Sequence, residues 1–423
     1  MIKKGNKNVD YIAITDANNN VDYPVKVWFA NANNTLKLIY ERPTYDIHII
    51  NLSINTKLGN ANKVTNIIFT NNLNLRNQAY NNNIVNVTYQ NNIPTFEFLV
   101  QNQDNQTFTC YVANAFYSPN KKVICHGNFR ECFAECTILT TINISQFDTT
   151  NITHLSLFFD NCNKLATLDL SNFVTTNVTS FVAMFRNCKS LTNLDLSNFT
   201  TTNVTSYNYM FSNCVKLIRL DLSTFNTTNA TSFYCMFQNV ESLRFLKINF
   251  NTSNCSTMFG MFQQLRNIIS LDISTFNTAN VTDMYQMFTN CNKLQRLFSF
   301  SFNKTKLQTD DSMFENLYNI KGEHGTTYLP EHIDSEYARI DGENGLPGYF
   351  CDPADAITLT LINVDNEQFT DELYFLSGDT YTIPNLEGYT ATVTDNNGNT
   401  YTDGDIITIN QDVTLNFVWT ATS

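Results

Sequence analysis

A repeat of 26 residues constrains this chain more than any other feature of its sequence. The apolar position of an L-D-L-S segment returns at steps of 26 residues, with a single step of 25. It falls at Ile142, Leu168, Leu194, Leu220, Leu246, Leu271 and Leu297. An aromatic residue of an M-F pair keeps the same steps, at Phe159, Phe185, Phe211, Phe237, Phe262, Phe288 and Phe314. A motif this regular indicates one structural unit that is used again and again.

Each copy of the motif divides into three parts. L-D-L-S alternates apolar and polar residues, which predicts a short strand with one buried face. T-T-N-V-T carries Asn and Thr side chains that can bond to nearby backbone and turn the chain. M-F-x-N-C-x-x-L has apolar residues at helical spacing and predicts one or two helical turns. Stacked copies would form an α/β repeat, a leucine-rich-repeat solenoid with a parallel sheet.

The motif L-x-x-L-D-L-S-x-F-x-T-x-N-V-T-x-M-x-x-M-F-x-N-C resembles the BspA-like leucine-rich repeat. That repeat type is known as a domain of unknown function in mycoplasmas and other bacteria. The resemblance covers residues 123–350, including atypical ends that we interpret as caps. It implies surface adhesion or protein–protein binding, and it brings no catalytic residue with it.

The flanking sequence predicts three further domains. Residues 1–42 alternate as three short strands and resemble the leader regions of structural proteins from tailed phages of gut bacteria. Residues 43–122 are β-rich and resemble no fold that we can name. Residues 351–423 resemble the small β-grasp repeats found beside leucine-rich repeats in bacterial surface proteins, with Trp419 as the core anchor. The solenoid is therefore expected between an N-terminal all-β region and a C-terminal β-grasp-like domain.

The net charge of -12 and the pI near 4.8 remove the attraction on which nucleic-acid binding depends. The first residues lack the apolar core of a secretory signal, and no later run is long enough to span a bilayer. We therefore expect no nucleic-acid partner and no membrane partner. Without a leader, a surface role is expected to be reached by assembly.

The cysteines invite a metal or disulfide interpretation, because Cys136, Cys162, Cys188, Cys214 and Cys291 occupy one column of the repeat. Val and Leu fill the same column in other copies, which indicates an apolar core position. The total of 11 cysteines is odd, and zinc at Cys132 and Cys136 lacks clustered histidines. N-x-T sequons also recur with the repeat, and we interpret them as a structural ladder. They lie at Asn151, Asn177, Asn203, Asn229 and Asn280.

The outward position of each predicted strand is the candidate binding site. It is filled by Asn143, Asp169, Asp195, Asp221, Lys247 and Asp272. Parallel strands lie about 4.8 Å apart, so neighbouring carboxylates would repel. Solvent and the nearby serines could relieve that repulsion, or the face could bind a divalent cation or a cationic partner. A catalytic acid pair is disfavoured because the acids repeat evenly.

The sequence predicts a protein that is not an enzyme and needs no cofactor or metal, since its five histidines are scattered and no phosphate-cradling loop is present. We expect a phage virion surface protein: a head fibre, capsid decoration or tail adhesin. Its N-terminal region would attach to virion proteins, and its repeats would bind a host-surface protein or glycan, with homo-oligomers possible. The alternatives are a cell-surface adhesin of a bacterium or protist and an intracellular protein-binding scaffold.

Overall fold

The computed structural model describes residues 149–422 in full, four earlier residues, and the backbone of the strands that precede residue 149. The four earlier residues are Arg130, Phe133, Ala134 and Ile142. The chain divides into two compact units. The first comprises Met1–Leu217 and Phe225–Glu241, and the second comprises Ile218–Thr224 and Ser242–Ser423.

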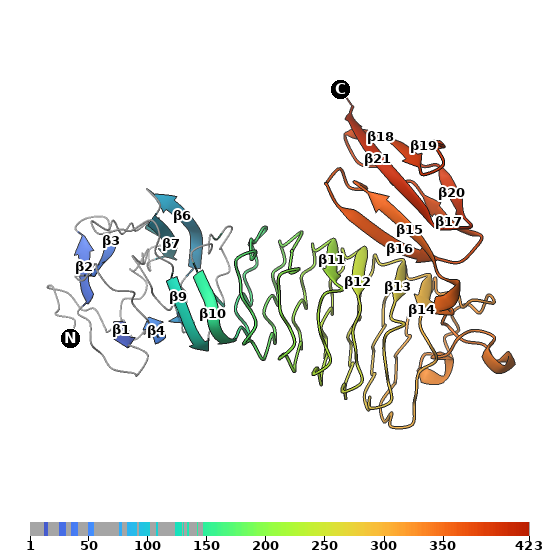
Figure 1. The fold of residues 1–423 in the computed structure, drawn as a ribbon, viewed down its shortest axis with the longest axis horizontal. Helices are drawn as coiled ribbons and strands as arrows, with labels where there is room; N and C mark the ends of the chain where they lie inside the picture. The colour runs from blue at the N-terminus through green and yellow to red at the C-terminus, as the bar shows by residue number, and fades with distance from the viewer. Residues whose placement is uncertain are drawn as a thin grey trace. The chain divides into compact units, whose positions relative to one another are not determined.

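The N-terminal part of the first unit consists of strands (Figure 1). Their bounds are β1 (Ile12–Thr15), β2 (Val25–Ala30), β3 (Thr35–Tyr40), β4 (Ile50–Ile54), β5 (Arg76–Asn77), β6 (Asn83–Gln90), β7 (Ile93–Gln101), β8 (Thr107–Phe108), β9 (Val123–Asn128) and β10 (Phe147–His154). β1 pairs with β4, β2 with β3, and β7 with both β6 and β8, all antiparallel. β5 pairs with β4, and β9 with β10, in parallel.

Backbone hydrogen bonds stack the copies of the repeat, and each folded copy is called a coil below. In the first unit, the N–H of Phe159 donates to the carbonyl of Met184 at 2.9 Å, and that of Phe185 donates to Met210 at 3.0 Å. In the second unit, Phe262 donates to Met287 at 2.9 Å in the same way. Each donor reaches a carbonyl 25 residues further along the chain, so the period of the sequence fixes the register between coils.

The strands of the second unit confirm the register of the leucine column. β11 (Arg219–Leu222) pairs in parallel with β12 (Phe245–Ile248), and Leu220 lies opposite Leu246. β13 (Ser270–Asp272) pairs in parallel with β14 (Arg296–Phe298), and Leu271 lies opposite Leu297. The equivalent segments of the first unit, 168–171 and 194–197, belong to the coils but do not form strands. The repeats thus contain short parallel pairs and not the single parallel sheet that the sequence predicts.

The predicted α/β class is wrong, because the described part of the chain is nearly all β. Its helices are three 3-10 turns of three residues each, and none lies in the M-F-x-N-C segments. They are η2 (Ser335–Tyr337), η3 (Glu343–Gly345) and η4 (Pro353–Asp355). The α/β leucine-rich-repeat solenoid with helical returns is therefore replaced by stacked, non-helical coils.

Left-handed backbone explains why the predicted helical turns do not form. Ala183 and Asn187 have φ angles of 54° and 60°, which an α-helix does not allow. The N–H of Met184 bonds locally to Phe181, whereas the next N–H, of Phe185, bonds to the neighbouring coil. Alternate N–H groups thus hold adjacent coils together, while the M-F-x-N-C spacing still turns the apolar side chains inward. The spacing of the apolar residues alone does not distinguish a helical turn from this left-handed backbone.

The Phe column forms a stack of rings in the core of the coils of each unit. Phe185 lies 6.0 Å from Phe159 and 5.7 Å from Phe211 between ring centroids, with interplanar angles of 13° and 10°. Phe288 is stacked in the same way on Phe262 and Phe314, at 5.4 and 5.6 Å. All these rings are completely buried. Their burial and mutual contact stabilise the coils without a helix.

Among the described residues of the Cys column, Cys188, Cys214 and Cys291 are completely buried and form no disulfide, as predicted. The Sγ atoms of Cys188 and Cys214 donate to the carbonyls of Phe159 and Phe185 at 3.3 and 3.1 Å. Burial raises the pKa of Cys214 to about 12. These thiols are core groups with one weak hydrogen bond each. Cys132 and Cys136, the zinc alternative, lie outside the described residues.

Two asparagine ladders run between coils. Four of the five sequon asparagines donate from Nδ2 to a backbone carbonyl of the preceding coil, which confirms their structural role. They are Asn177, Asn203, Asn229 and Asn280. A second ladder joins left-handed asparagines to one another: Asn213 donates to Asn187 at 3.0 Å and accepts from Asn239 at 2.6 Å.

Residues 321–350 close the last coil of the second unit. Tyr349 and Phe350 pack edge-on against the ring of Phe314, at 5.3 and 6.1 Å. The Asp341 carboxylate accepts hydrogen bonds from the backbone N–H groups of His324 and Thr326, at 2.8 and 3.0 Å. These contacts cover the apolar end that a terminal repeat would otherwise expose.

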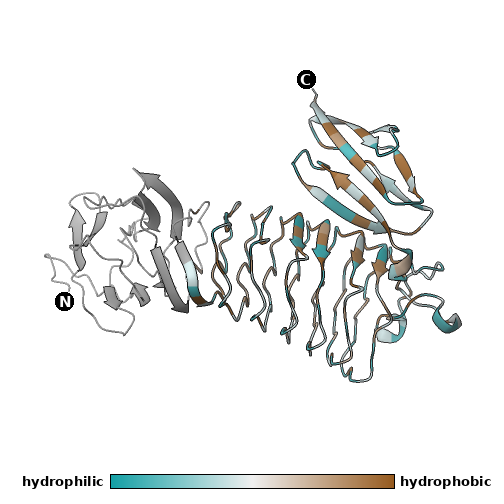
Figure 2. Ribbon diagram, in the orientation of Figure 1, coloured by the Kyte–Doolittle hydropathy of each residue, from teal (hydrophilic) through white to brown (hydrophobic). Residues whose placement is uncertain are grey.

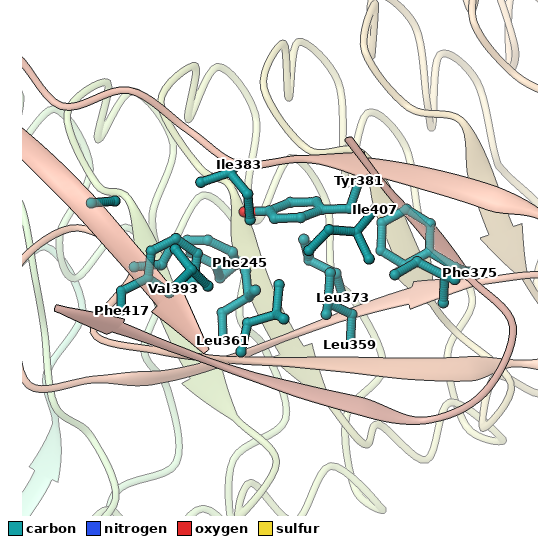
Figure 3. Packing of buried hydrophobic residues seen from close by; sticks show 14 residues of the cluster. Phe245, Leu359, Leu361, Leu373, Phe375, Tyr381, Ile383, Val393, Ile407 and Phe417 are labelled. Atoms are coloured by element: carbon teal, nitrogen blue, oxygen red, sulfur yellow. The ribbon is translucent and has the colours of Figure 1, made fainter. Parts of the chain in front are cut away.

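The C-terminal sheet domain, residues 351–423, alternates hydrophobic and hydrophilic residues along its strands (Figure 2). Its strands are β15 (Ile357–Ile362), β16 (Thr370–Phe375), β17 (Asp379–Thr382), β18 (Tyr389–Asp395), β19 (Thr400–Thr402), β20 (Ile406–Ile409) and β21 (Val413–Ala421). Five of them form a sheet in the order β16-β15-β21-β18-β19, and β17 pairs with β20. Between these two sheets lies a cluster of buried apolar residues that includes Leu361, Tyr381 and Phe417 (Figure 3).

No α-helix packs on this sheet within the described residues, so the β-grasp prediction is corrected together with the fold class. The two-stranded sheet of β17 and β20 contributes Tyr381, Ile407 and Ile409 to the core. Trp419, the expected core anchor, lies half-buried at the margin of the cluster, and its Nε1 donates to the carbonyl of Asn363 at 2.8 Å.

Cys188 tests the core column. We expect Cys188→Val to lower the free energy of unfolding by less than about 1.5 kcal/mol, because the swap nearly preserves volume. Cys188→Asp is expected to cost about 3–5 kcal/mol, because it leaves a buried charge uncompensated. Urea denaturation of both variants measures the difference. Equal stability of the two variants would contradict burial of this column.

Asn213 tests the left-handed backbone, since its φ is 62°. Asn213→Ala and Asn213→Gly both remove the ladder hydrogen bonds, and only alanine retains the strain of a left-handed residue. We expect the glycine variant to be more stable by about 1 kcal/mol. A helical turn would give the opposite order, with alanine favoured by about 1 kcal/mol. Thermal unfolding monitored by circular dichroism ranks the two variants.

Candidate binding surface

The structure spreads the predicted site residues over both units. Asp169 and Asp195 lie exposed on the first unit, and Asp221 lies exposed on the second. Asp272 and Lys247 are half-buried on the second unit, and Asn143 lies outside the described residues. Among these positions, the parallel register of β11 and β12 places Asp221 directly opposite Lys247.

Each aspartate of this column caps the turn that follows it. Oδ1 of Asp169 accepts from the N–H of Ser171 at 2.9 Å, and Asp195 and Asp221 accept from Ser197 and Ser223 at the same distance. The hydrogen bonds from Ser171 lower the pKa of Asp169. This geometry supports the interpretation in which the serines relieve the carboxylates. Within the described residues, no group of three His, Cys, Asp or Glu side chains is placed to hold a metal ion.

Lys247, the one cation of the column, contacts the C-terminal sheet domain. Its Nζ lies 2.8 Å from the Glu372 carboxylate of β16. This ion pair belongs to a larger contact in the second unit, in which β16 packs against β12, β13 and β14. The strand side of these coils is therefore occupied by a folded domain of the same chain.

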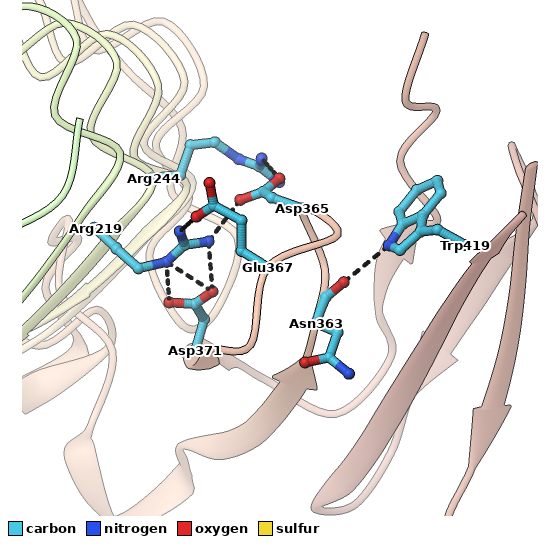
Figure 4. A network of polar contacts seen from close by, with 7 residues as sticks. All are labelled: Arg219, Arg244, Asn363, Asp365, Glu367, Asp371 and Trp419. Atoms are coloured by element: carbon cyan, nitrogen blue, oxygen red, sulfur yellow. Dashed lines mark hydrogen bonds and ion pairs between the residues drawn. The ribbon is translucent and has the colours of Figure 1, made fainter. Parts of the chain in front are cut away.

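Arg219 forms the centre of that contact (Figure 4). Its guanidinium donates to Asp371 at 3.1 Å, to Glu367 at 2.8 Å and to Asp365 at 2.7 Å. Asp365 also accepts from Arg244, at 2.5 Å. Only 8% of the Arg219 side chain and 5% of the Asp371 side chain are exposed, so both charges have lost most of their water. Burial raises the pKa of Asp371, and Arg219 opposes that shift.

Apolar and neutral contacts complete the surface around Arg219. Phe245 of β12 belongs to the buried cluster of the C-terminal domain, and Ile218 and Ile269 pack against that cluster (Figure 3). The Tyr374 N–H of β16 donates to the Ser270 hydroxyl at 2.8 Å. The docked domain thereby covers its edge strand β16, which would otherwise expose unpaired backbone groups.

The charges of the two partners in this contact are segregated by sequence. Residues 351–423 contain twelve acidic residues and no Lys, Arg or His. Their charge of -12 therefore equals the net charge of the whole chain. The remaining 350 residues are balanced, with 26 acidic and 26 basic side chains. The coils supply Arg219, Arg244, Lys247 and Arg296, and the last of these pairs with Asp379 at 2.5 Å. The surface is thus a cationic and apolar face that binds an acidic sheet.

Sequence reasoning missed this surface, although departures from the repeat mark it. The residue just before the strand leucine is polar and neutral in two copies of the first unit, at Thr167 and Asn193. The same position becomes Arg219, Phe245, Ser270 and Arg296 in the later copies. The preceding position changes from Ala166 and Thr192 to Ile218, Arg244 and Ile269, and it is Gln295 in the last copy. Side chains that break the repeat are therefore the docking residues, whereas the regularly repeated aspartates cap the turns that follow them.

Comparison with known proteins identifies the repeats. Residues 127–245 and 218–327 match the family model described as "Mycoplasma protein of unknown function, DUF285". This match is consistent with the expected BspA-like repeat family, and residues 1–126 and 328–423 lie beyond it. No curated protein and no solved structure matches the chain. Within the described residues, no helix is long and apolar enough to cross a membrane.

Arg219 tests the energetics of the contact. We expect Arg219→Met to lower the free energy of unfolding by about 3–5 kcal/mol, because three carboxylates lose their buried cation. Arg244→Met is the matched control: this side chain is 34% exposed, and its loss should cost no more than about 1 kcal/mol. Chemical denaturation of both variants gives the comparison. Similar losses for the two arginines would contradict the central role of Arg219.

Proposed function

We propose that this chain is a non-enzymatic binding protein of a phage virion surface, such as a head fibre, capsid decoration or tail adhesin. Its N-terminal region attaches to virion proteins, and its repeats and C-terminal domain face a host-surface protein or glycan. One observation carries the binding role: the strand side of β11–β14 holds a folded sheet by combining apolar contacts with charge pairs. A surface built in this way is suited to recognising protein.

The construction of the coils supports a scaffold role. Their inward side chains stack as Phe and Cys columns, and their turn asparagines bond to neighbouring coils. These groups fix the shape of each coil. The position just before the strand leucine changes from Thr167 to Arg219 and Phe245, while these columns and ladders are kept. A rigid frame with variable outward positions is the arrangement by which repeat proteins recognise partners.

The strands before residue 149 support attachment by strand pairing. β2 and β3 form an antiparallel two-stranded sheet, and within the described strands neither pairs with any other. An open sheet edge can accept a strand from a partner by β-augmentation. The resemblance of residues 1–42 to phage leader regions favours a virion protein as that partner.

Removal of residues 1–42 tests the attachment. We expect the shortened chain to fold and stay soluble but to be absent from purified particles, because the augmenting strands are gone. The full chain and the Cys188→Val variant serve as controls and should both sediment with particles. Quantitative mass spectrometry of gradient-purified particles provides the measurement.

Two outcomes would count against the virion role. The shortened chain could still assemble, or the full chain could be missing from every particle preparation. Either result would favour the cell-surface adhesin, which needs no virion partner. In that case the binding role of the coils would be tested on cells and not on particles.

A further inference from the structure

We propose that the strand side of β11–β14 is a protein-binding strip that the C-terminal domain masks, and that its external partner is a polypeptide with an acidic β-strand edge. The strip consists of Ile218, Arg219, Arg244, Phe245, Lys247, Ile269 and Arg296. The proposal rests on the proposed binding function for its setting, and it names the surface and the chemistry of the partner.

The strip selects its occupant by charge and by backbone. It presents four cations around three apolar side chains. β16, its preceding loop and the first residue of β17 supply five carboxylates: Asp365, Glu367, Asp371, Glu372 and Asp379. Ser270 adds a hydroxyl that accepts from the N–H of Tyr374 at 2.8 Å. A ligand that satisfies this set must carry carboxylates on an extended strand. A cationic peptide or a neutral sugar supplies no carboxylate to the guanidinium groups.

The composition of the contact favours a domain that can move away from the strip, and it does not favour a permanently buried core. Buried ion pairs give specificity, but the cost of removing water offsets much of their attraction. Five carboxylates of the C-terminal domain face four cations of the strip, so the acidic groups outnumber the cations that they pair with. The margin is also open to water, since 44% of the Lys247 side chain and 45% of the Glu367 side chain are exposed.

The chain connection allows the mask to lift without unfolding the coils. Cys351 is fixed to β14, the last strand of the coils, because its N–H donates to the carbonyl of Leu297 at 2.9 Å and its own carbonyl accepts from the N–H of Ser299 at 3.2 Å. The C-terminal sheet starts at Ile357, so the proposed movement is assigned to residues 352–356, the short connection that contains η4. The domain keeps its own sheets and most of its apolar cluster when it moves as a body.

Cys351 is a built-in reporter of that movement. It is completely buried and packs with Phe298 of the coils and Leu376 of the C-terminal domain. Burial raises the pKa of the Cys351 thiol to about 12, so the closed state protects it from alkylation. Cys214 and Cys291 lie inside the coils and report only on unfolding of the coils.

Asp371→Arg is the variant that should open the mask. It places a second guanidinium against Arg219 and leaves every residue of the strip unchanged. Alkylation by N-ethylmaleimide, read for each cysteine by peptide mass spectrometry, is expected to accelerate at Cys351 by roughly tenfold or more, which corresponds to about 1.4 kcal/mol in the opening equilibrium. Cys214 and Cys291 should stay protected. Lys293→Met, on an exposed coil residue, is the control that should leave Cys351 protected.

The partner chemistry is tested with a synthetic peptide of residues 363–375, the segment that contains β16 and its preceding loop. Fluorescence anisotropy should show this peptide binding to the Asp371→Arg chain and not to the unmodified chain, whose strip is covered. A control peptide with Asp365→Asn, Glu367→Gln and Asp371→Asn should bind neither chain. Equal binding of both peptides would exclude recognition by charge.

Two further outcomes of the alkylation experiment decide whether the C-terminal domain can leave the strip. If Asp371→Arg exposes Cys214 and Cys291 as well, Glu367→Lys at the margin replaces it with the same measurements. Protection of Cys351 in a variant with intact coils would show that the contact is permanent, and the proposal would be wrong. These assays involve no particle, so their failure is separate from failure of the virion role, which the deletion of residues 1–42 tests.

Discussion

The hydrogen bond from one coil to a carbonyl 25 residues further along is the interaction on which the rest of the structure depends. It fixes the axial register, and the register brings every side-chain column into line. Phe rings then stack on Phe rings, and Asn213 reaches Asn187. Without that bond the buried thiols and turn asparagines would have no neighbour to meet, because every one of these contacts joins residues of adjacent coils.

The same regularity explains how a binding surface can be recognised within a repeat. Positions that serve the stack keep their residue type from copy to copy, since each must meet its equivalent in the next coil. Positions that serve a partner are released from that requirement. Arg219, Phe245 and Arg296 occupy a column that is Thr or Asn in earlier coils, and all three contact the C-terminal domain or its core. A break in the pattern therefore marks docking, and the regular Asp column marks capping.

The functional consequence is a chain that carries an occupant for its own surface. The acidic C-terminal domain lies against the cationic strip, and this intramolecular contact involves Lys247, which lies opposite Asp221 in the register of β11 and β12. Any external partner of that side competes with β16. The strand side of the coils in the first unit carries Asp169 and Asp195 instead, each held by its own serine.

The sequence by itself determined the period, the register and the inward columns. These follow from local rules: a residue repeated every 26 positions must meet its equivalent, and apolar residues must leave water. The repeat family and the buried, unpaired Cys column could be predicted for the same reason. The helical turns could not, because M-F-x-N-C buries the same residues in a helix and in alternating left-handed turns. Only the hydrogen bonds between coils decide in favour of the turns.

The docking surface was likewise decided by tertiary structure alone. Arg219 and Asp371 are separated by 152 residues, and nothing local to either one indicates the other. The sequence does contain both halves of the signal, namely the breaks in the repeat and the absence of cations after Arg339. Their meeting depends on how β16 lies across β12, β13 and β14, and that placement arises from packing between domains and not from the local pattern of either segment.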